Sequence, residues 1–252
     1  MVTIATKEDP RVWNVNLEGT KNVFDLAMKS GISRVIYVSS AHAIVEEPAP
    51  NIITEPSFFS SALVHGQYAK SKAAAAKLAL QFAKEGLPVS IVHPSGIIGP
   101  FDHAKANHMT RSIEAMAKGT IPMPIQGGYD FVDVRDVAQG ILQCEDKGKN
   151  GECYLLTGHY LTVEDLLKLV CSARGRRYLP LCIPAKLAEF VAPMGELISR
   201  SLGSKPLLTP YSVYTLQTNA MFSHQKASNT FGYNPRPIEE TIEDTLLDLG
   251  LK

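Results

Sequence analysis

A tyrosine and a lysine four positions later, Tyr68 and Lys72, head an alanine-rich run in the stretch HGQYAKSKAAAAK. On a helix, residues four apart share one face, so the phenol and the ammonium can approach each other. An ammonium nearby favours the phenolate and lowers the pKa of a tyrosine toward the working range of a general acid or base. The pair is a candidate for moving a proton to or from a substrate oxygen. Its spacing alone carries little weight, because such pairs also arise by chance.

A serine hydroxyl could assist that chemistry. The apolar run Val35–Val38 predicts a buried strand that ends at Ser39 and Ser40. Ligands of open α/β sheets gather at the carboxyl ends of the strands. A hydroxyl at this place could polarise the same substrate oxygen that the tyrosine serves.

The elements that must position these residues alternate along the chain. Apolar runs predict strands at 35–38, 89–92, 131–134 and 154–156, and periodicity predicts helices over 10–31, 68–86 and 166–173. Asp9 with Pro10 predicts one helix start, and Thr162 with Asp165 resembles a capping box before another. This alternation predicts an α/β fold with a parallel sheet covered on both faces. After about residue 174 short, proline-punctuated helices are expected instead.

Composition excludes several classes of protein. Lys plus Arg and Asp plus Glu number 25 each, so no global charge recruits nucleic acid. The N-terminus has no apolar signal segment, and the uncharged run 206–225 is too polar for an integral membrane segment. Four scattered cysteines without a CxxC spacing favour reduced thiols in a cytoplasmic protein over a zinc site or disulfides.

The order of the motifs resembles a known superfamily. NLEGTKN at 16–22, YVSSA at 37–41, YAKSK at 68–72, HPSGIIGP at 93–100 and FVDVRDVA at 131–138 follow one another, and FGYNPRPIEETIEDTL lies at 231–246. This arrangement is similar to the extended short-chain dehydrogenases/reductases, the superfamily of NAD-dependent epimerases and dehydratases. Within it, the nearest likeness is to the dihydroflavonol-4-reductase-like and 3β-hydroxysteroid-dehydrogenase-like branch. The likeness covers nearly the whole chain.

The resemblance implies a particular architecture. We expect a Rossmann-like, doubly wound parallel sheet that is N-terminally incomplete, together with a smaller, mostly helical C-terminal substrate lobe. Residues 1–160 would form the dinucleotide-binding domain and 161–252 the substrate-binding lobe, to which 101–128 would contribute.

The resemblance also implies roles for single residues. Tyr68 would donate a proton to a ketone or accept one from an alcohol, and Lys72 would lower its pKa and bind the nicotinamide ribose. Ser40, with Ser39 as the alternative, would polarise the substrate oxygen. A small-molecule substrate and no metal are implied, and a homodimer is allowed. The cofactor, NADP or NAD, would contact Tyr68, Lys72, Asn16, Val38, Pro94, Ser95 and Ile97.

The expected phosphate-binding loop is missing from the sequence. No G-x-x-G-x-x-G or G-x-G-x-x-G occurs in these 252 residues, and the pair Gly96 and Gly99 precedes Pro100, where a helix should open. We expect that the N-terminal half of the cofactor domain is absent, through a truncated gene, an internal start or a split chain.

Three functions stay open on the sequence. The first is an NAD(P)-dependent oxidoreductase acting on a secondary alcohol or ketone. The second is a nucleotide-sugar epimerase or dehydratase on the same scaffold. The third is an inactive fragment that lacks cofactor binding.

Overall fold

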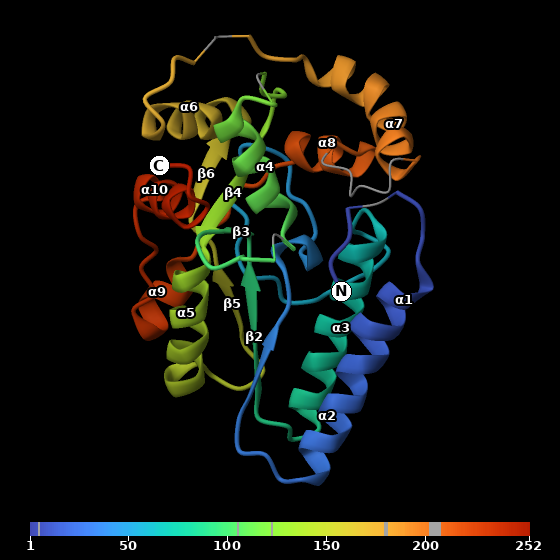
Figure 1. Cartoon of the computed structure of the whole chain (residues 1–252). Helices are drawn as coiled ribbons and strands as arrows, with labels where there is room; N and C mark the ends of the chain where they lie inside the picture. The colour runs from blue at the N-terminus through green and yellow to red at the C-terminus, as the bar shows by residue number, and fades with distance from the viewer. Residues whose placement is uncertain (5, 105, 122, 179–180, 202–207) are drawn as a thin grey trace.

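Two three-stranded sheets form the centre of the molecule (Figure 1). The computed structural model describes residues 1–4, 6–104, 106–121, 123–178, 181–201 and 208–252. Its elements in chain order are α1 (Pro10–Trp13), the π-helical η1 (Asn14–Glu18), α2 (Gly19–Lys29), β1 (Val35–Val38), the 3₁₀ turn η2 (Ala41–Ala43), α3 (Gln67–Lys84), β2 (Val89–Pro94), β3 (Gly96–Ile98), α4 (His108–Lys118), β4 (Gly128–Asp133), α5 (Val134–Lys147), β5 (Cys153–Leu156), β6 (His159–Thr162), α6 (Val163–Ala173), α7 (Ala185–Ser201), α8 (Pro210–Gln217), α9 (Gln225–Phe231) and α10 (Ile238–Asp248).

The first sheet is parallel, in the order β1-β2-β5. Its side chains alternate between two cores, because successive strand residues point to opposite faces. Ile91 and Leu155 pack with α2 and α3, whereas Val92 and Leu156 pack with α5 and α9. The predicted parallel sheet with helices on both faces is therefore confirmed.

The strand expected at 131–134 belongs elsewhere. The observed β4 is Gly128–Asp133, and Val134 already starts α5. β4 pairs in parallel with β3 and antiparallel with β6, so it lies in the second sheet and not beside β5. The sequence prediction was wrong here because a short apolar run does not reveal which strand it pairs with. β3 and β6 were not predicted.

The first helical segment begins as predicted but contains an unexpected stretch. The Asp9 side chain accepts a hydrogen bond from the Arg11 backbone N–H, and Pro10 occupies the first turn. The chain then passes without a break through π-helical η1 into α2. Asn16 lies in the π-helical stretch and is only 4% exposed. Such stretches occur often at functional sites.

Helix α3 confirms the predicted alanine-rich helix and begins at a position that requires glycine. Gly66 has a φ of +86°, and a Cβ there would lie 2.3 Å from the Tyr211 ring. Four alanines of α3 are fully buried, which lets the helix pack closely on β1, β2 and α2. Figure 1 shows α2 and α3 side by side along the sheet. This packing holds the first turn of α3 against the carboxyl end of β1.

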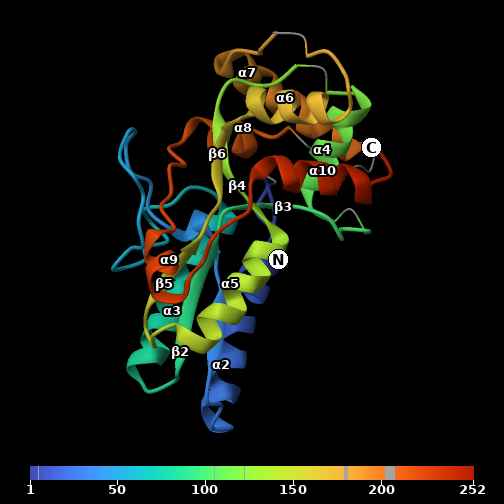
Figure 2. The same ribbon diagram turned by 90° about the vertical axis from the view of Figure 1, so that its left-hand side faces the viewer.

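Helices from distant parts of the chain cover the second sheet. Helix α4 contacts α6 and α10, and α10 also contacts β4 (Figure 2). Their shared core includes Ile98, Ile113, Leu166 and Ile242. Thr162 caps α6 by accepting from the Asp165 N–H at 3.0 Å, as its sequence pattern predicted, although α6 starts at Val163. The division of the chain into two lobes stays a prediction.

After residue 174, helices α8 and α9 are short, as expected, but α7 is not. Helix α7 spans seventeen residues, Ala185–Ser201, and keeps Pro193 inside it. Of the uncharged run 206–225, residues 206 and 207 lie outside the described residues, and the rest contains α8 and a bridge from Phe222 to Ile53. Among the described helices, none is long and apolar enough to cross a membrane.

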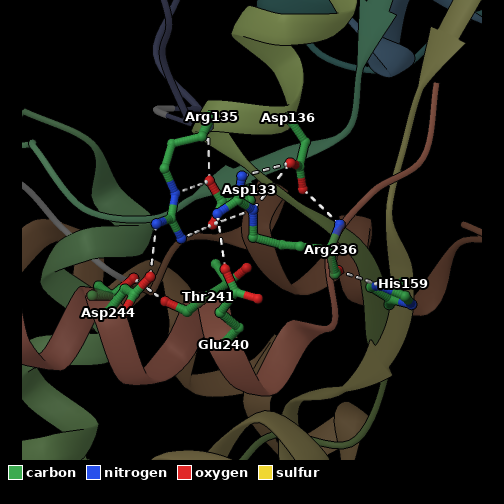
Figure 3. A network of polar contacts seen from close by, with 9 residues as sticks. Asp133, Arg135, Asp136, His159, Arg236, Glu240, Thr241 and Asp244 are labelled. Atoms are coloured by element: carbon green, nitrogen blue, oxygen red, sulfur yellow. Dashed lines mark hydrogen bonds and ion pairs between the residues drawn. The ribbon is translucent and has the colours of Figure 1, made fainter. Parts of the chain in front are cut away.

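An ionic network ties the C-terminal segment to the second sheet (Figure 3). Asp133 caps α5, and its side chain, with no exposed surface, binds the Arg135 guanidinium at 2.7 Å and lies 3.6 Å from Arg236 Nε. Arg135 also pairs with Asp244 of α10 at 2.7 Å, and Arg236 pairs with Asp136 at 2.9 Å. The network joins β4, α5 and α10 at one buried carboxylate.

Candidate functional site

The structure brings Ser40 and Tyr68 together. Ser40 follows the end of β1 and caps η2, where its hydroxyl oxygen accepts from the His42 N–H at 3.3 Å. Tyr68 lies in the first turn of α3, and its side chain has the Ser40 side chain as a hydrogen-bond partner. Both side chains are nearly buried, at 6% and 9% exposure. Two hydroxyls that the chain separates by twenty-seven residues of loop and turn thus meet at one point.

The pKa of Tyr68 moves in the opposite direction from the sequence expectation. Burial raises it above its ordinary value, and the hydrogen bond with Ser40 opposes that increase only in part. The ammonium of Lys72 was expected to lower this pKa, but desolvation of the phenolate outweighs any such effect. Tyr68 is therefore protonated at neutral pH, the form that can donate a proton.

Lys72 is held by the end of the neighbouring strand. Its Nζ donates to the Val38 carbonyl at 2.9 Å and lies 5.3 Å from the centre of the Tyr37 ring. Burial lowers the pKa of Lys72 to about 8. The ammonium thus stands at the carboxyl end of β1, one helical turn from Tyr68.

Asn16 is connected to the same turn of α3. Its Nδ2 donates to Ser71 Oγ at 3.0 Å, and the Ser71 hydroxyl donates to the Tyr68 carbonyl at 2.7 Å. Ser71 has no exposed surface. The π-helical stretch of the first helix is therefore linked to the backbone of Tyr68.

The segment from Pro94 to Ile97 divides between the two sheets. Pro94 ends β2, and Ile97 pairs with Val132 in the second sheet. The Ser95 hydroxyl donates to Asp130 Oδ1 at 2.5 Å, so this side chain is engaged within the protein. Gly96 lies in β3, and the next described helix after Gly99 is α4, which begins at His108.

Asp130 is a buried carboxyl that sequence reasoning did not identify. It is 2% exposed and accepts from the Ser95 hydroxyl and, at 2.8 Å, from the Gly158 N–H. Burial raises its pKa to about 6, although both hydrogen bonds favour the carboxylate. Folding therefore favours the protonated form of this side chain.

This raised pKa predicts a pH dependence of stability. The stabilisation that Asp130 contributes is fully present below pH 3.8, the pKa of its side chain in the unfolded chain. It is lost as the pH rises through about 6, the pKa in the folded protein. The difference between these two pKa values corresponds to about 3 kcal/mol of unfolding free energy. We expect wild type to lose about this much stability relative to Asp130→Asn between pH 3.5 and 7, measured by urea unfolding. A constant difference between the two proteins across this range would contradict the prediction.

A hollow opens beside Ser40 and Tyr68. It passes the next residues in the chain, Ala41 and Ala69. The Tyr129 hydroxyl and His42 Nε2 lie 3.2 Å apart in its wall, and the Tyr214 hydroxyl donates to Glu46 at 2.9 Å. Six of the residues that line it carry rings, namely His42, His65, Tyr129, Tyr211, Tyr214 and Phe222.

The sequence carried almost no signal for this hollow. Its lining comes from the loop after β1, from β4 and from the α8 region, segments that meet only in the folded chain. Ala41 and Ala69 lie within recognised motifs, and His42, His65 and Tyr129 lie close to them, but nothing in the sequence brings these positions together. Burial lowers the pKa of His42 to about 4, so its imidazole is neutral at physiological pH.

Comparisons with known proteins place the chain in context. Residues 3–156 match the family model described as "NAD dependent epimerase/dehydratase family". The chain is 27% identical over 249 residues to "Sterol demethylase protein B" of Methylococcus capsulatus, which covers 97% of this chain and 75% of that protein. It is 26% identical over 251 residues to "3beta-hydroxysteroid-dehydrogenase/decarboxylase isoform 1" of Arabidopsis thaliana, covering 93% of this chain and 57% of that protein.

A solved structure is similar over the whole chain. The crystal structure of gox2253 superposes with a TM-score of 0.82 at 29% identity and covers 99% of this chain and 76% of that one.

Proposed function

Since the chain belongs to the NAD dependent epimerase/dehydratase family, we propose that it transfers a hydride between a nicotinamide cofactor and a secondary alcohol or ketone. The family is the one that the ordered motifs resembled. The observation that carries the proposal is the meeting of the protonated Tyr68 with the Ser40 hydroxyl beside an open hollow. Hydrogen-bond donors that converge on one point are what a ketone oxygen requires when it gains negative charge.

Tyr68 is the proposed proton donor, and Ser40 its partner on the substrate oxygen. During reduction the Tyr68 hydroxyl gives its proton to the developing alkoxide while the Ser40 hydroxyl hydrogen-bonds the same oxygen. In the opposite direction the Tyr68 oxygen accepts the proton of an alcohol. Lys72, a positive charge one turn away, stabilises the negative charge that Tyr68 acquires when it gives up its proton.

The residues at the carboxyl ends of β1 and β2 suit the nicotinamide ribose. Lys72 is held at the Val38 carbonyl, where its remaining N–H groups can bind ribose hydroxyls. Asn16, Pro94 and Ile97 are proposed to flank this end of NAD or NADP, and Ser95 through its backbone, because its hydroxyl binds Asp130. When bound, the nicotinamide supplies the hydride. The expectation of a missing glycine-rich segment stays a prediction.

The chemistry of the hollow favours an uncharged ketone as substrate. Among the described residues that line it, none is Lys or Arg, and Glu46 contributes a negative charge. A nucleotide sugar carries a diphosphate, which such a lining would repel because no cation compensates its charge. The alternative of a nucleotide-sugar epimerase or dehydratase is therefore less well supported than reduction of a ketone.

The test is a turnover assay with NADPH or NADH. We expect oxidation of one of them, followed at 340 nm, with acetophenone or cyclohexanone, and no conversion of UDP-glucose. Conversion of UDP-glucose without net oxidation of the cofactor would establish the epimerase alternative. A folded chain that binds neither dinucleotide in a fluorescence titration would establish the inactive alternative.

The lowered pKa of Lys72 predicts that the rate of reduction falls at alkaline pH. Its pKa of about 8 means that the ammonium is lost as the pH rises through this value. We expect kcat/KM for NADPH, which reports the free enzyme, to fall tenfold per pH unit above about 8. In Lys72→Arg the decrease in kcat/KM should begin only above about pH 10, because a guanidinium keeps its proton. If kcat/KM of this variant fell at the same pH as that of wild type, the ionisation would belong to another group.

We also propose a small-molecule substrate without a nucleic-acid partner, supported by the balanced charge of 25 cationic and 25 anionic residues. We propose a cytoplasmic location as well, supported by the four cysteines, which all lie in the described part of the chain and form no disulfide. A homodimer is compatible with the proposal, and light scattering of the purified chain would measure its mass.

A further inference from the structure

A histidine with no exposed surface holds the backbone of Ser40. His93 is the next-to-last residue of β2, and its Nδ1 lies 3.0 Å from the Ser40 carbonyl oxygen. The imidazole stacks on the Phe59 ring, with centres 5.3 Å apart and planes inclined by 26°. Phe59 is itself buried, so the ring of His93 is confined on this side.

The backbone ladder explains why a side chain is needed here. Val38 pairs with Val92, and the Ser39 N–H donates to the Val92 carbonyl at 2.8 Å. The next donor on β2 would be the nitrogen of residue 94, but Pro94 has no N–H. β2 therefore has no further backbone donor for the chain beyond β1. The imidazole of His93 bridges the two segments just past this point.

The partners of His93 determine its tautomer. A carbonyl oxygen is only an acceptor, so Nδ1 must carry the hydrogen. The Ser40 carbonyl also accepts from the Ala43 N–H at 3.0 Å, which uses its second lone pair. His93 Nε2 is then an unprotonated nitrogen, and it is buried without a hydrogen-bond partner in the described part of the chain.

The surroundings keep this imidazole neutral. Burial lowers the pKa of His93 to about 4, and the nearby positive charge of Lys72 contributes to the decrease. A neutral ring has one N–H, and the Ser40 carbonyl receives it. Such a ring stabilises the fold little, because its one N–H binds a single carbonyl and its other nitrogen is buried without a partner. Its hydrogen bond instead acts at one place, the residue that bears the Ser40 hydroxyl.

We propose that His93 is a positioning residue, which fixes the Ser40 carbonyl through Nδ1–H and thereby holds the Ser40 hydroxyl against Tyr68. The inference rests on the function proposed for Ser40 and Tyr68. A backbone freed at Ser40 would let its hydroxyl drift from the substrate oxygen, and a displacement of about 1 Å can reduce the rate about 100-fold.

A pair of variants of similar shape separates the hydrogen bond from packing. Asn places its amide nitrogen near the position of His Nδ1 and keeps a donor, whereas Leu has nearly the same shape and no donor. In NADPH-dependent reduction of acetophenone, we expect His93→Leu to lower kcat by about 10- to 100-fold with KM within about twofold. His93→Asn should retain kcat within about threefold. Equal losses in the two variants would overturn the proposal.

A double-mutant cycle tests whether His93 acts through Ser40. In the Ser40→Ala background, His93→Leu should change kcat by less than about threefold, because the hydroxyl to be positioned is gone. Additive losses would overturn the positioning role while leaving the proposed function intact. If Ser40→Ala alone kept full kcat, the role of Ser40 in the proposed function would fail, and the role of His93 would fail with it.

The tautomer can be read without turnover. Long-range ¹H–¹⁵N correlation spectra of the wild-type chain should show His93 with Nδ1 protonated and Nε2 unprotonated, unchanged from pH 5.5 to 8.5. An Nε2-protonated ring, the form that free imidazole side chains prefer, would overturn the proposal whatever the kinetics show.

Discussion

Tyr68→Phe is expected to lower kcat for ketone reduction by about 1,000-fold while the dissociation constant for NADPH stays within about threefold. The variant removes one oxygen, the proposed source of the proton, from a ring that is 9% exposed. The phenyl ring remains to fill the space, so the first turn of α3 and the position of Lys72 are retained. Steady-state kinetics and a fluorescence titration with NADPH measure the two quantities.

Tyr233→Phe is the matched control for this change. Tyr233 is 3% exposed, and its hydroxyl donates to the Thr157 carbonyl at 3.1 Å in the core between α5 and α9. We expect this variant to lose about 1 kcal/mol of unfolding free energy and to keep full kcat. If Tyr68→Phe turned over as fast as Tyr233→Phe, Tyr68 would not be the proton donor.

Asp133→Asn is expected to have the largest effect on stability, about 3 to 5 kcal/mol. The buried carboxylate accepts from the Arg135 backbone N–H at 2.7 Å, from the Arg135 guanidinium, and faces Arg236 at 3.6 Å (Figure 3). A neutral amide removes the counter-charge that these two guanidiniums share, whereas the cap of α5 is kept because Asn caps a helix as well as Asp does. Urea unfolding at pH 7 measures the loss, which should appear as a lower midpoint with an unchanged slope.

The control for this variant is an exposed ion pair. Asp25→Asn removes the partner of Lys21 on α2, where the two side chains are 37% and 50% exposed. Its effect should stay below about 0.5 kcal/mol, because water already screens this pair. A loss at Asp133 as small as that at Asp25 would mean that the network in Figure 3 contributes little to stability.

The lowered pKa of Asp133 predicts that the protein loses stability at acidic pH. Burial alone would raise the pKa of Asp133, but the hydrogen bonds from Arg135 outweigh it and hold the pKa below its usual value. The stabilisation is therefore present above 3.8 and is lost as the pH falls through the folded-state value, the reverse of the dependence on Asp130.

Local chemistry made several elements predictable. Caps and periodicity involve residues within about four positions of one another, so the start of α1 at Asp9, the cap of α6 at Thr162 and helix α3 followed from the printed order of residues. Strands β1 and β2 followed from short apolar runs bounded by polar residues. The motif order also indicated the family that residues 3–156 match.

The pairing of strands and the titration of side chains depended on contacts between distant segments. β4 carries an apolar run like those of β1 and β5, yet it pairs with β3 and β6, because register is set by the whole arrangement of strands. The direction of the Tyr68 pKa was likewise undetermined, since an i, i+4 spacing predicts the approach of a cation but not the burial that opposes it.

By itself, the sequence determined which side chains could do chemistry and on which elements they stand, with Tyr68 and Lys72 one turn apart on a helix and Ser40 at the end of a strand. Only the tertiary structure decided their setting. It placed Tyr129 and Tyr214 around the hollow, engaged Ser95 with Asp130, and put His93 under the Ser40 carbonyl. The physical reason is the separation of the interacting residues along the chain. Hydrogen bonds within a turn join residues that are close in sequence, whereas burial and the partners of buried polar atoms depend on segments far apart in the chain that pack together.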